Sequence, residues 1–273
     1  GWMFQGDYYL TSINVSGMTK LEITDRMFSG CERLTTINQP TFSGVQNAEY
    51  MFANCRVLTG LDISAMTNIT NALGMLSGCA KLTDINAQNF SKVLDARTMF
   101  SGCSGLVNVI VAGMSNVTDV TDMFNYCAAL KKVDLSGMAK VTSVPAISLS
   151  KASIEELNLS GMSSVTDLSF LEEFTKLKKV NLSGITEVTA VPNLSASKNT
   201  LEEINISGMT GVTNTEALFL NYMRLSIVNA SSMTSVIDAN NMFNSCSTLK
   251  SVDVSGMTNV TDVSYMFESC LAL

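Results

Sequence analysis

The chain has 273 residues, of which 46% are hydrophobic and 15% charged, with a net charge of −7 and no histidine. Without histidine, Ser-His-Asp and Cys-His catalysis is impossible, and no P-loop or dinucleotide-binding glycine motif occurs. The negative charge and the lack of a Lys/Arg face argue against a nucleic-acid partner. No apolar run approaches the ~20 residues that span a bilayer. We therefore predict a protein that is not an enzyme and is not inserted in a membrane, with no catalytic residues, cofactor or metal site.

A unit of 24 residues repeats along the chain, and its first methionine marks the period: Met3, Met27, Met51, Met75, Met99 and Met123. Self-similarity at this period with an L-x-x-L-x-L core is typical of a leucine-rich repeat solenoid. We predict one solenoid domain over residues 1–273, with about 11–12 units and truncated within a unit at both ends. Its expected α/β architecture has a parallel sheet on the concave face and short helices or irregular turns on the convex face.

Each unit carries a short alternation of aliphatic residues, seen clearly at Leu130, Val133 and Leu135. Alternation predicts a strand with its aliphatic side turned inward. Because every unit repeats this pattern, the strands are expected to stack into one long parallel sheet.

A Ser-Gly-Met turn follows the strand in several units, and a return segment then closes the unit. In residues 119–127 and just beyond, Met123, Cys127 and Leu130 fall at i, i+4 and i+7, which predicts a short helix. An Asp/Asn column precedes this segment and is predicted to cap the helix: Asn47, Asn71, Asp95, Asp119, Asp167, Asn214, Asp238 and Asp262.

The middle of the chain departs from the pattern, because the units that begin at Ile147, Phe170 and Leu194 lack Met-Phe and Cys. Pro145 and Pro192 disfavour helix at the residue before each of them. We therefore expect more extended return segments here, without a domain break.

All seven cysteines form one column of the repeat: Cys31, Cys55, Cys79, Cys103, Cys127, Cys246 and Cys270. Strand spacing of ~4.8 Å would permit disulfides between neighbouring units. The count is odd, however, and the column also holds Phe174 and Tyr222, with Lys151 and Lys198 aligned to it in the proline-containing units. A position that accepts cysteine or an aromatic ring is a packing position, so buried reduced thiols are expected.

Two polar ladders lie on the outward side of the predicted strands. The first is an Asn/Asp column, interrupted at Ile110. Its side chains either hydrogen-bond to one another from unit to unit, as a structural feature, or form the base of a concave binding surface. The second alternates in charge and either stabilises the strand register or forms a recognition patch. The candidate binding face comprises Lys131, Lys132, Glu155, Glu156, Lys178, Lys179, Glu202, Glu203, Asn158, Asn181 and Asn205.

The pattern M-F-x-x-C-x-x-L-x-x-[LIV]-[DN]-[LIV]-S, followed by V-T-D, resembles the BspA-like leucine-rich-repeat surface proteins of bacteria. It is clearest over Met123–Met138 and Met242–Phe267 and weakest over 147–220. The turn after the strand is tighter than is usual in that family. The resemblance implies a secreted or cell-surface protein of a host-associated bacterium, whose partners are extracellular matrix or plasma proteins, or glycans. It transfers no catalytic residue.

The leading hypothesis is therefore a non-enzymatic adhesion module that binds host extracellular proteins or glycans through the solenoid surface. One alternative is a structural stalk or spacer that displays another domain. A second alternative is an enzyme-associated module that captures carbohydrate, which is disfavoured because the tyrosines do not form one column.

Overall fold

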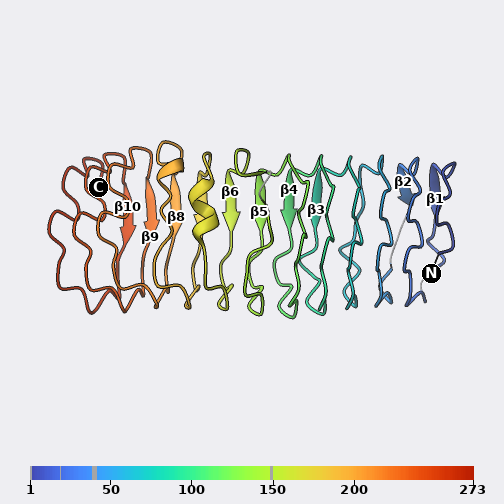
Figure 1. The fold of residues 1–273 in the computed structure, drawn as a ribbon, viewed down its shortest axis with the longest axis horizontal. Coiled ribbons are helices and arrows are strands. Elements are labelled where there is room, and N and C mark those ends of the chain that lie inside the picture. The colour runs from blue at the N-terminus through green and yellow to red at the C-terminus, as the bar shows by residue number, and fades with distance from the viewer. Residues whose placement is uncertain (1, 19, 39–41, 148–149) are drawn as a thin grey trace. The chain divides into compact units, whose positions relative to one another are not determined.

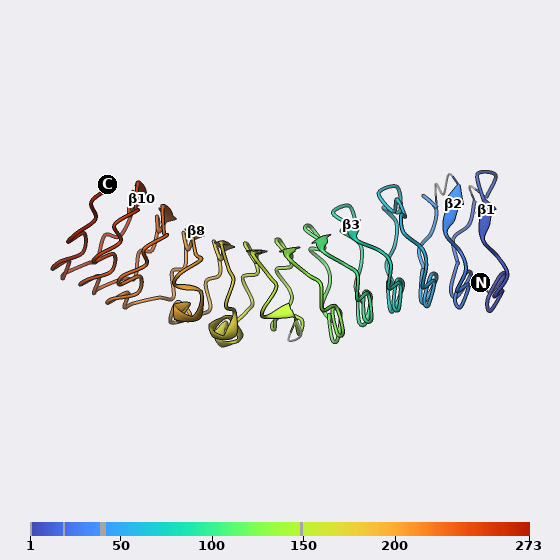
Figure 2. The same ribbon diagram turned by 90° about the horizontal axis from the view of Figure 1, so that it is seen from above.

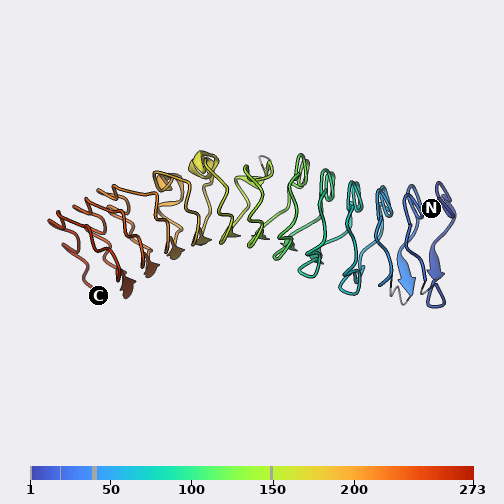
Figure 3. The same ribbon diagram turned by 90° about the horizontal axis from the view of Figure 1, so that it is seen from below.

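The computed structural model describes residues 2–18, 20–38, 42–147 and 150–273. The chain divides into two compact units, Gly1–Ser153 and Ile154–Leu273. Each is a stack of repeats with short parallel strands on one side and return segments on the other, as the edge-on views show (Figures 2 and 3). The predicted leucine-rich repeat solenoid is confirmed, whereas the prediction that residues 1–273 form a single domain stays a prediction.

All ten strands of the described residues are three residues long, and their pairings inside each unit are parallel and join sequence neighbours (Figure 1). The second and third strands of the chain do not pair, so the single long sheet expected from the sequence is interrupted there. The first unit contains β1 (Ser12–Asn14), β2 (Thr36–Asn38), β3 (Asp84–Asn86), β4 (Asn108–Ile110) and β5 (Lys132–Asp134). The second contains β6 (Glu156–Asn158), β7 (Lys179–Asn181), β8 (Glu203–Asn205), β9 (Ile227–Asn229) and β10 (Ser251–Asp253).

The strand prediction is confirmed, because the middle residue of a strand points inward and its two neighbours point outward. Val133 on β5 and Val180 on β7 are buried, as are Leu130 and Leu135 on either side of β5. One repeat lacks an assigned strand, at residues 60–62. There Gly60 occupies the first strand position, and glycine weakens a strand because it has no side chain to pack.

The helix predicted near residues 119–127 is wrong. No α-helix occurs among the described residues, and the regular return segments are pairs of consecutive β-turns. In residues 24–31, the Met27 N–H donates to the Thr24 carbonyl (3.0 Å) and the Cys31 N–H to the Phe28 carbonyl (3.1 Å). The third residue of each turn has positive φ, +53° at Arg26 and +78° at Gly30, as a type II turn requires.

The N–H groups between these turn bonds pair with the next repeat. Phe28 donates to the Met51 carbonyl (2.8 Å), and Phe52 donates in turn to the Met75 carbonyl (2.9 Å). We call this arrangement the turn ladder: residues 24–31, 48–55, 72–79, 96–103 and 120–127 in the first unit, and 215–222, 239–246 and 263–270 in the second. In the segments within 24–103 and 215–246, every second N–H has its partner in the next repeat, so helical bonds are not needed to satisfy the backbone there.

The Asp/Asn column caps turns and not helices, so the predicted capping role is also wrong in detail. The Asn47 Oδ1 accepts the Glu49 N–H (3.0 Å), and the Asp119 Oδ1 accepts the Thr121 N–H (3.0 Å). A side-chain oxygen that accepts the N–H two residues on forms an Asx turn. The Asp and Asn side chains therefore cap the backbone at the start of turn ladder segments.

Phenylalanines and thiols fill the space between strands and turn ladder. Phe28 stacks on Phe52 with ring centroids 5.5 Å apart, and Phe100 on Phe124 at the same separation. Each cysteine thiol donates to a carbonyl of the preceding repeat, as Cys55 does to Phe28 (3.2 Å). All seven cysteines are free, with six buried and Cys270 partly exposed. The prediction of reduced, packed thiols is confirmed.

The return segments of the proline-containing repeats differ from the turn ladder. Residues 144–147 and 191–194 have no regular secondary structure, so the extended conformation expected from Pro145 and Pro192 stays a prediction. Two short 3-10 helices occur in the second unit, η2 (Ser169–Glu173) and η3 (Ser195–Ser197).

The buried polar side chains of these repeats are serines. Ser197 Oγ donates to the Phe174 carbonyl, and Ser150 Oγ donates likewise to the Cys127 carbonyl. Lys151 and Lys198, which align with the cysteine column in the sequence, are only half-buried.

Candidate functional site

The candidate binding face is divided between the two units, so each part is described by itself. Lys131 and Lys132 belong to the first unit, where both are exposed at the start of β5. The other nine residues belong to the second unit. There the register places Lys179 of β7 opposite Glu156 of β6 on one side and Glu203 of β8 on the other.

The charged side chains of the second unit form ion pairs across neighbouring repeats. Lys178 Nζ lies 2.7 Å from Glu155 Oε2, and Lys179 Nζ lies 2.8 Å from Glu203 Oε1. The hydrogen bond to the Glu155 carboxylate raises the pKa of Lys178, and the one to Glu203 raises the pKa of Lys179. These side chains are 31–48% exposed, and solvent-exposed pairs stabilise a fold only slightly.

Arg224 extends this network and was not foreseen from the sequence. Its Nη2 lies 3.2 Å from Glu202 Oε1. The charge columns hold Ser226 and Ile227 in this repeat, so the alternation stops there in the sequence. Only the reach of the arginine side chain from the preceding turn brings it to Glu202.

The asparagines of the face cap the turns that follow their own strands. The Oδ1 atoms of Asn158, Asn181 and Asn205 accept the N–H two residues on, at 3.1, 3.0 and 3.0 Å. Asn229 does the same with Ser231 (3.0 Å). All four side chains are half-buried. Among the described residues these amides do not bond to one another, so a unit-to-unit amide ladder is not what holds them.

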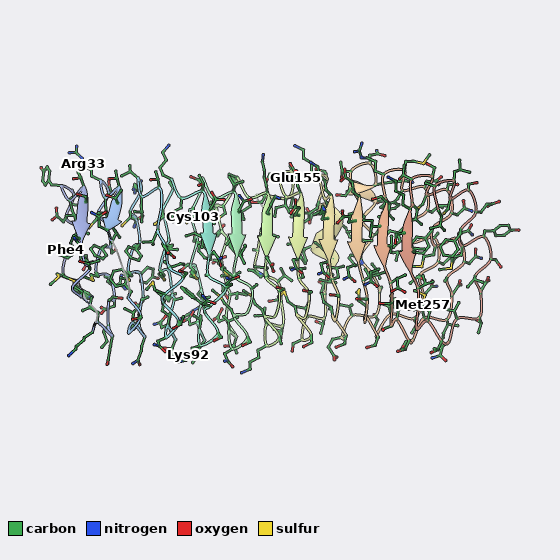
Figure 4. All side chains as sticks on the ribbon, turned by 180° about the vertical axis from the view of Figure 1, so that it is seen from behind. Phe4, Arg33, Lys92, Cys103, Glu155 and Met257 are labelled. Atoms are coloured by element: carbon green, nitrogen blue, oxygen red, sulfur yellow. The ribbon has the colours of Figure 1, made fainter. Side chains whose placement is uncertain are left out.

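Net charge is distributed unevenly between the two units. Residues 1–153 carry eleven Lys/Arg and eleven Asp/Glu, whereas residues 154–273 carry six and thirteen. The whole excess of −7 therefore lies in the second unit. In Figure 4, Glu155 lies at the edge where the strands of the second unit begin.

The outward face of the second unit also has an apolar position. Ile227, the first residue of β9, is 47% exposed. It follows Glu203 in the same outward column, because β8 and β9 pair with Glu203 opposite Ile227. The face thus offers paired charges, amides and one exposed aliphatic side chain.

Two further observations concern the residues that the structure describes. They contain no group of three or more Cys, Asp or Glu side chains placed to hold a metal ion. None of their helices is long and apolar enough to cross a membrane.

Comparison with protein families gives a different match for each half of the chain. Residues 22–138 match the family described as "Mycoplasma protein of unknown function, DUF285". Residues 150–257 match the leucine-rich repeat domain of the endo-β-N-acetylglucosaminidase EndoS. A comparison with curated proteins found no match.

Solved structures show the same fold at low sequence identity. The Toll–Spätzle complex of Drosophila is 14% identical with a TM-score of 0.50, and the match covers 93% of this chain and 37% of that one. A leucine-rich repeat protein of Leptospira interrogans is 13% identical with a TM-score of 0.48, covering 86% and 70%. A leucine-rich cell surface protein of Faecalibacterium prausnitzii is 18% identical with a TM-score of 0.36, covering 92% and 81%.

Proposed function

We propose that this chain is a non-enzymatic binding module of a bacterial cell-surface protein, which recognises host extracellular proteins or glycans through the outward face of its strands. The observation that carries the proposal is the face of β6–β9, where polar side chains stand in register on strands whose inward residues alone serve the core. The fold uses only part of the hydrogen-bonding capacity of these side chains, and the remainder is available to a partner.

Two similarities support this reading. The M-F-x-x-C repeat resembles the BspA-like surface proteins, in which adhesion is the common role. The Toll–Spätzle structure, whose fold matches, is that of a complex between two partners. Solenoids of this kind offer extended binding surfaces because each repeat adds one strand to the same face.

The test is binding of the purified chain to an array of matrix proteins, plasma proteins and glycans. The comparison variant replaces Lys178, Lys179, Glu202 and Glu203 by alanine. We expect at least one ligand to bind saturably to the parent chain. Its affinity for the face variant should be at least about tenfold lower, which corresponds to ~1.4 kcal/mol. The control replaces Glu187 and Glu216, which lie outside this face, by alanine. Unchanged binding in the face variant would refute the assignment of the site.

A second candidate function has its own support. The match of residues 150–257 to the EndoS leucine-rich repeat domain favours a module appended to a carbohydrate-active enzyme. In that case the chain would bind glycan on behalf of a catalytic domain elsewhere in the polypeptide. A chain that folds and binds nothing on the array would instead favour the spacer role.

A further inference from the structure

Four asparagines stand in one line across the second unit, on consecutive strands. The strand register pairs Asn158 with Asn181, Asn181 with Asn205, and Asn205 with Asn229. Neighbouring parallel strands lie ~4.8 Å apart, so the four side-chain amides repeat at that interval. We call these four residues the amide row.

The orientation of each amide in this row is fixed by the fold. Every Oδ1 accepts a backbone N–H two residues on, at 3.0–3.1 Å. An amide whose oxygen is held in this way must direct its NH₂ group elsewhere, and an asparagine NH₂ has two donors. Among the described residues these nitrogens have no hydrogen-bond partner. The row is therefore a set of donors with one common geometry.

The charges beside the row are already neutralised by each other. Glu155 pairs with Lys178, and Lys179 with Glu203, so the nearest cations are engaged. The unit as a whole carries the net charge of −7. An anionic polymer would be repelled by that field, whereas an uncharged ligand rich in oxygen acceptors would not.

The interval of the row distinguishes between two kinds of uncharged chain. An extended polypeptide presents carbonyls on one side at every second residue, about 6.6 Å apart, which does not match a 4.8 Å repeat. Along one edge of a β-linked polysaccharide every sugar presents hydroxyl oxygens, although successive units of a β-1,4 chain are turned over and alternate in which hydroxyls they present. The length of one sugar unit is close to the spacing of strands. The match favours a linear glycan lying across the strands.

We propose that the amide row binds a neutral, linear, β-linked glycan, with Asn158, Asn181, Asn205 and Asn229 donating to oxygens of successive sugar units. This inference rests on the proposed binding function of the same face and names its ligand class. No aromatic platform lies on β6–β9, so affinity comes from the number of aligned hydrogen bonds and rises with glycan length.

The chain itself supplies the variant that tests the row. In the same column, Asp134 and Asp253 make the identical turn, each accepting the N–H two residues on at 2.9 Å. Replacing Asn181 and Asn205 by aspartate keeps that turn and removes four amide donors. The matched control is N193D/N214D, since Asn193 and Asn214 form the same Asx turn on return segments and add the same charge.

The probes are cellohexaose, chitohexaose and laminarihexaose, their disaccharides, and heparin as an anionic comparison, titrated by calorimetry. We expect one hexasaccharide to bind, its disaccharide to bind at least about tenfold more weakly, and N181D/N205D to lose at least about tenfold in affinity, or ~1.4 kcal/mol. N193D/N214D should bind like the parent chain. Circular dichroism and urea unfolding establish that both variants are folded.

Three results would overturn the inference. These are no binding of any hexasaccharide at about 5 mM, equal binding by N181D/N205D and the parent chain, or tighter binding of heparin than of the neutral sugars. If a protein on the array binds through the charged residues while no hexasaccharide binds, the proposed function stands and the glycan assignment fails. If neither ligand class binds, both fail together.

Discussion

In residues 24–103 the return side of each repeat is a pair of turns bonded to the next repeat, whereas in residues 168–198 it consists of 3-10 helices and segments without regular secondary structure. The strands are the same in both regions, three residues long with one residue inward. The two return sides share one further feature, a small buried donor that reaches a carbonyl of the preceding repeat. It is a thiol at Cys79 and a hydroxyl at Ser197.

This comparison teaches that the strand side defines the repeat while the return side is interchangeable. Any return segment is accepted if it fills the core with a large apolar side chain and satisfies the carbonyl beneath it. Phe100 does the first in one region and Phe174 in the other, and both are fully buried. The predictions below test that equivalence, from the largest expected effect to the smallest.

Removing the large aromatic side chain should be the most damaging change in both regions. We expect F100A and F174A each to lower the free energy of unfolding by ~3–5 kcal/mol, because a fully buried ring leaves a cavity that the repeat cannot close. Urea unfolding followed by circular dichroism measures this, with the exposed Thr59→Ala as control. A loss below about 1 kcal/mol in only one variant would show that the two regions are not packed equivalently.

Removing the small buried hydrogen-bond donor should have the second-largest effect. The loss in free energy of unfolding should be greater in the region of the 3-10 helices than in the turn ladder. Ser197→Ala leaves the Phe174 carbonyl without its donor and also the Leu177 N–H, which donates to Ser197 Oγ at 3.1 Å. Cys79→Ala removes one of two donors to the Phe52 carbonyl, which still accepts the Cys55 N–H at 3.1 Å. We expect ~2–3 kcal/mol for S197A, since each buried unsatisfied group costs ~1–3 kcal/mol, and at most ~1 kcal/mol for C79A, which leaves no group unsatisfied. The reverse order in urea unfolding would contradict this account.

Alkaline pH should distinguish the thiol-rich region from the serine region. Burial raises the pKa of Cys31 to about 11 and of Cys127 to about 12, from an ordinary value of 9.0. The folded chain thus holds thiol protons that the unfolded chain loses, so this stability is complete below pH ~9 and is lost as pH rises through the folded-state pKa values.

The measurement is the urea midpoint at a series of pH values from neutrality to about 11, for the parent chain and for C31S/C127S. Lysines and tyrosines titrate in both proteins, so the difference between the two curves isolates the thiols. The parent should lose more stability than the variant above pH ~9. Parallel curves would show that these thiols do not titrate differently on folding.

The smallest effect is expected on the strand face. Lys179→Met removes the ion pair with Glu203, whose side chains are 48% and 38% exposed. The urea midpoint should hardly move, and any difference from the parent chain should vanish at high salt, because exposed pairs are screened. A large loss of stability that does not depend on salt would mean that the charge alternation stabilises the stacked repeats. That result would weaken the case for a role of these charges in binding.

Much of the strand side could be read from the sequence. The columns of Leu130, Val133 and Leu135 give the inward positions, and the opposite parity gives the outward ones, because side chains in a strand alternate strictly. The candidate charges could likewise be placed on one face. The reach of Arg224 to Glu202 could not, since it has no counterpart in the repeat and depends on a side-chain conformation.

What the sequence by itself determined is the repeat, its strand register and the burial of its cysteines, because these follow from local periodicity and composition. Tertiary structure decided the return side. Met123, Cys127 and Leu130 have helical spacing, yet they lie in or beside turns. In the equivalent segments within 24–103, alternate N–H groups donate to carbonyls of the next repeat, a pairing between repeats that local spacing does not reveal. The direction of the four asparagine amides was decided in the same way, by a backbone N–H that takes one end of the side chain and leaves the other end to solvent.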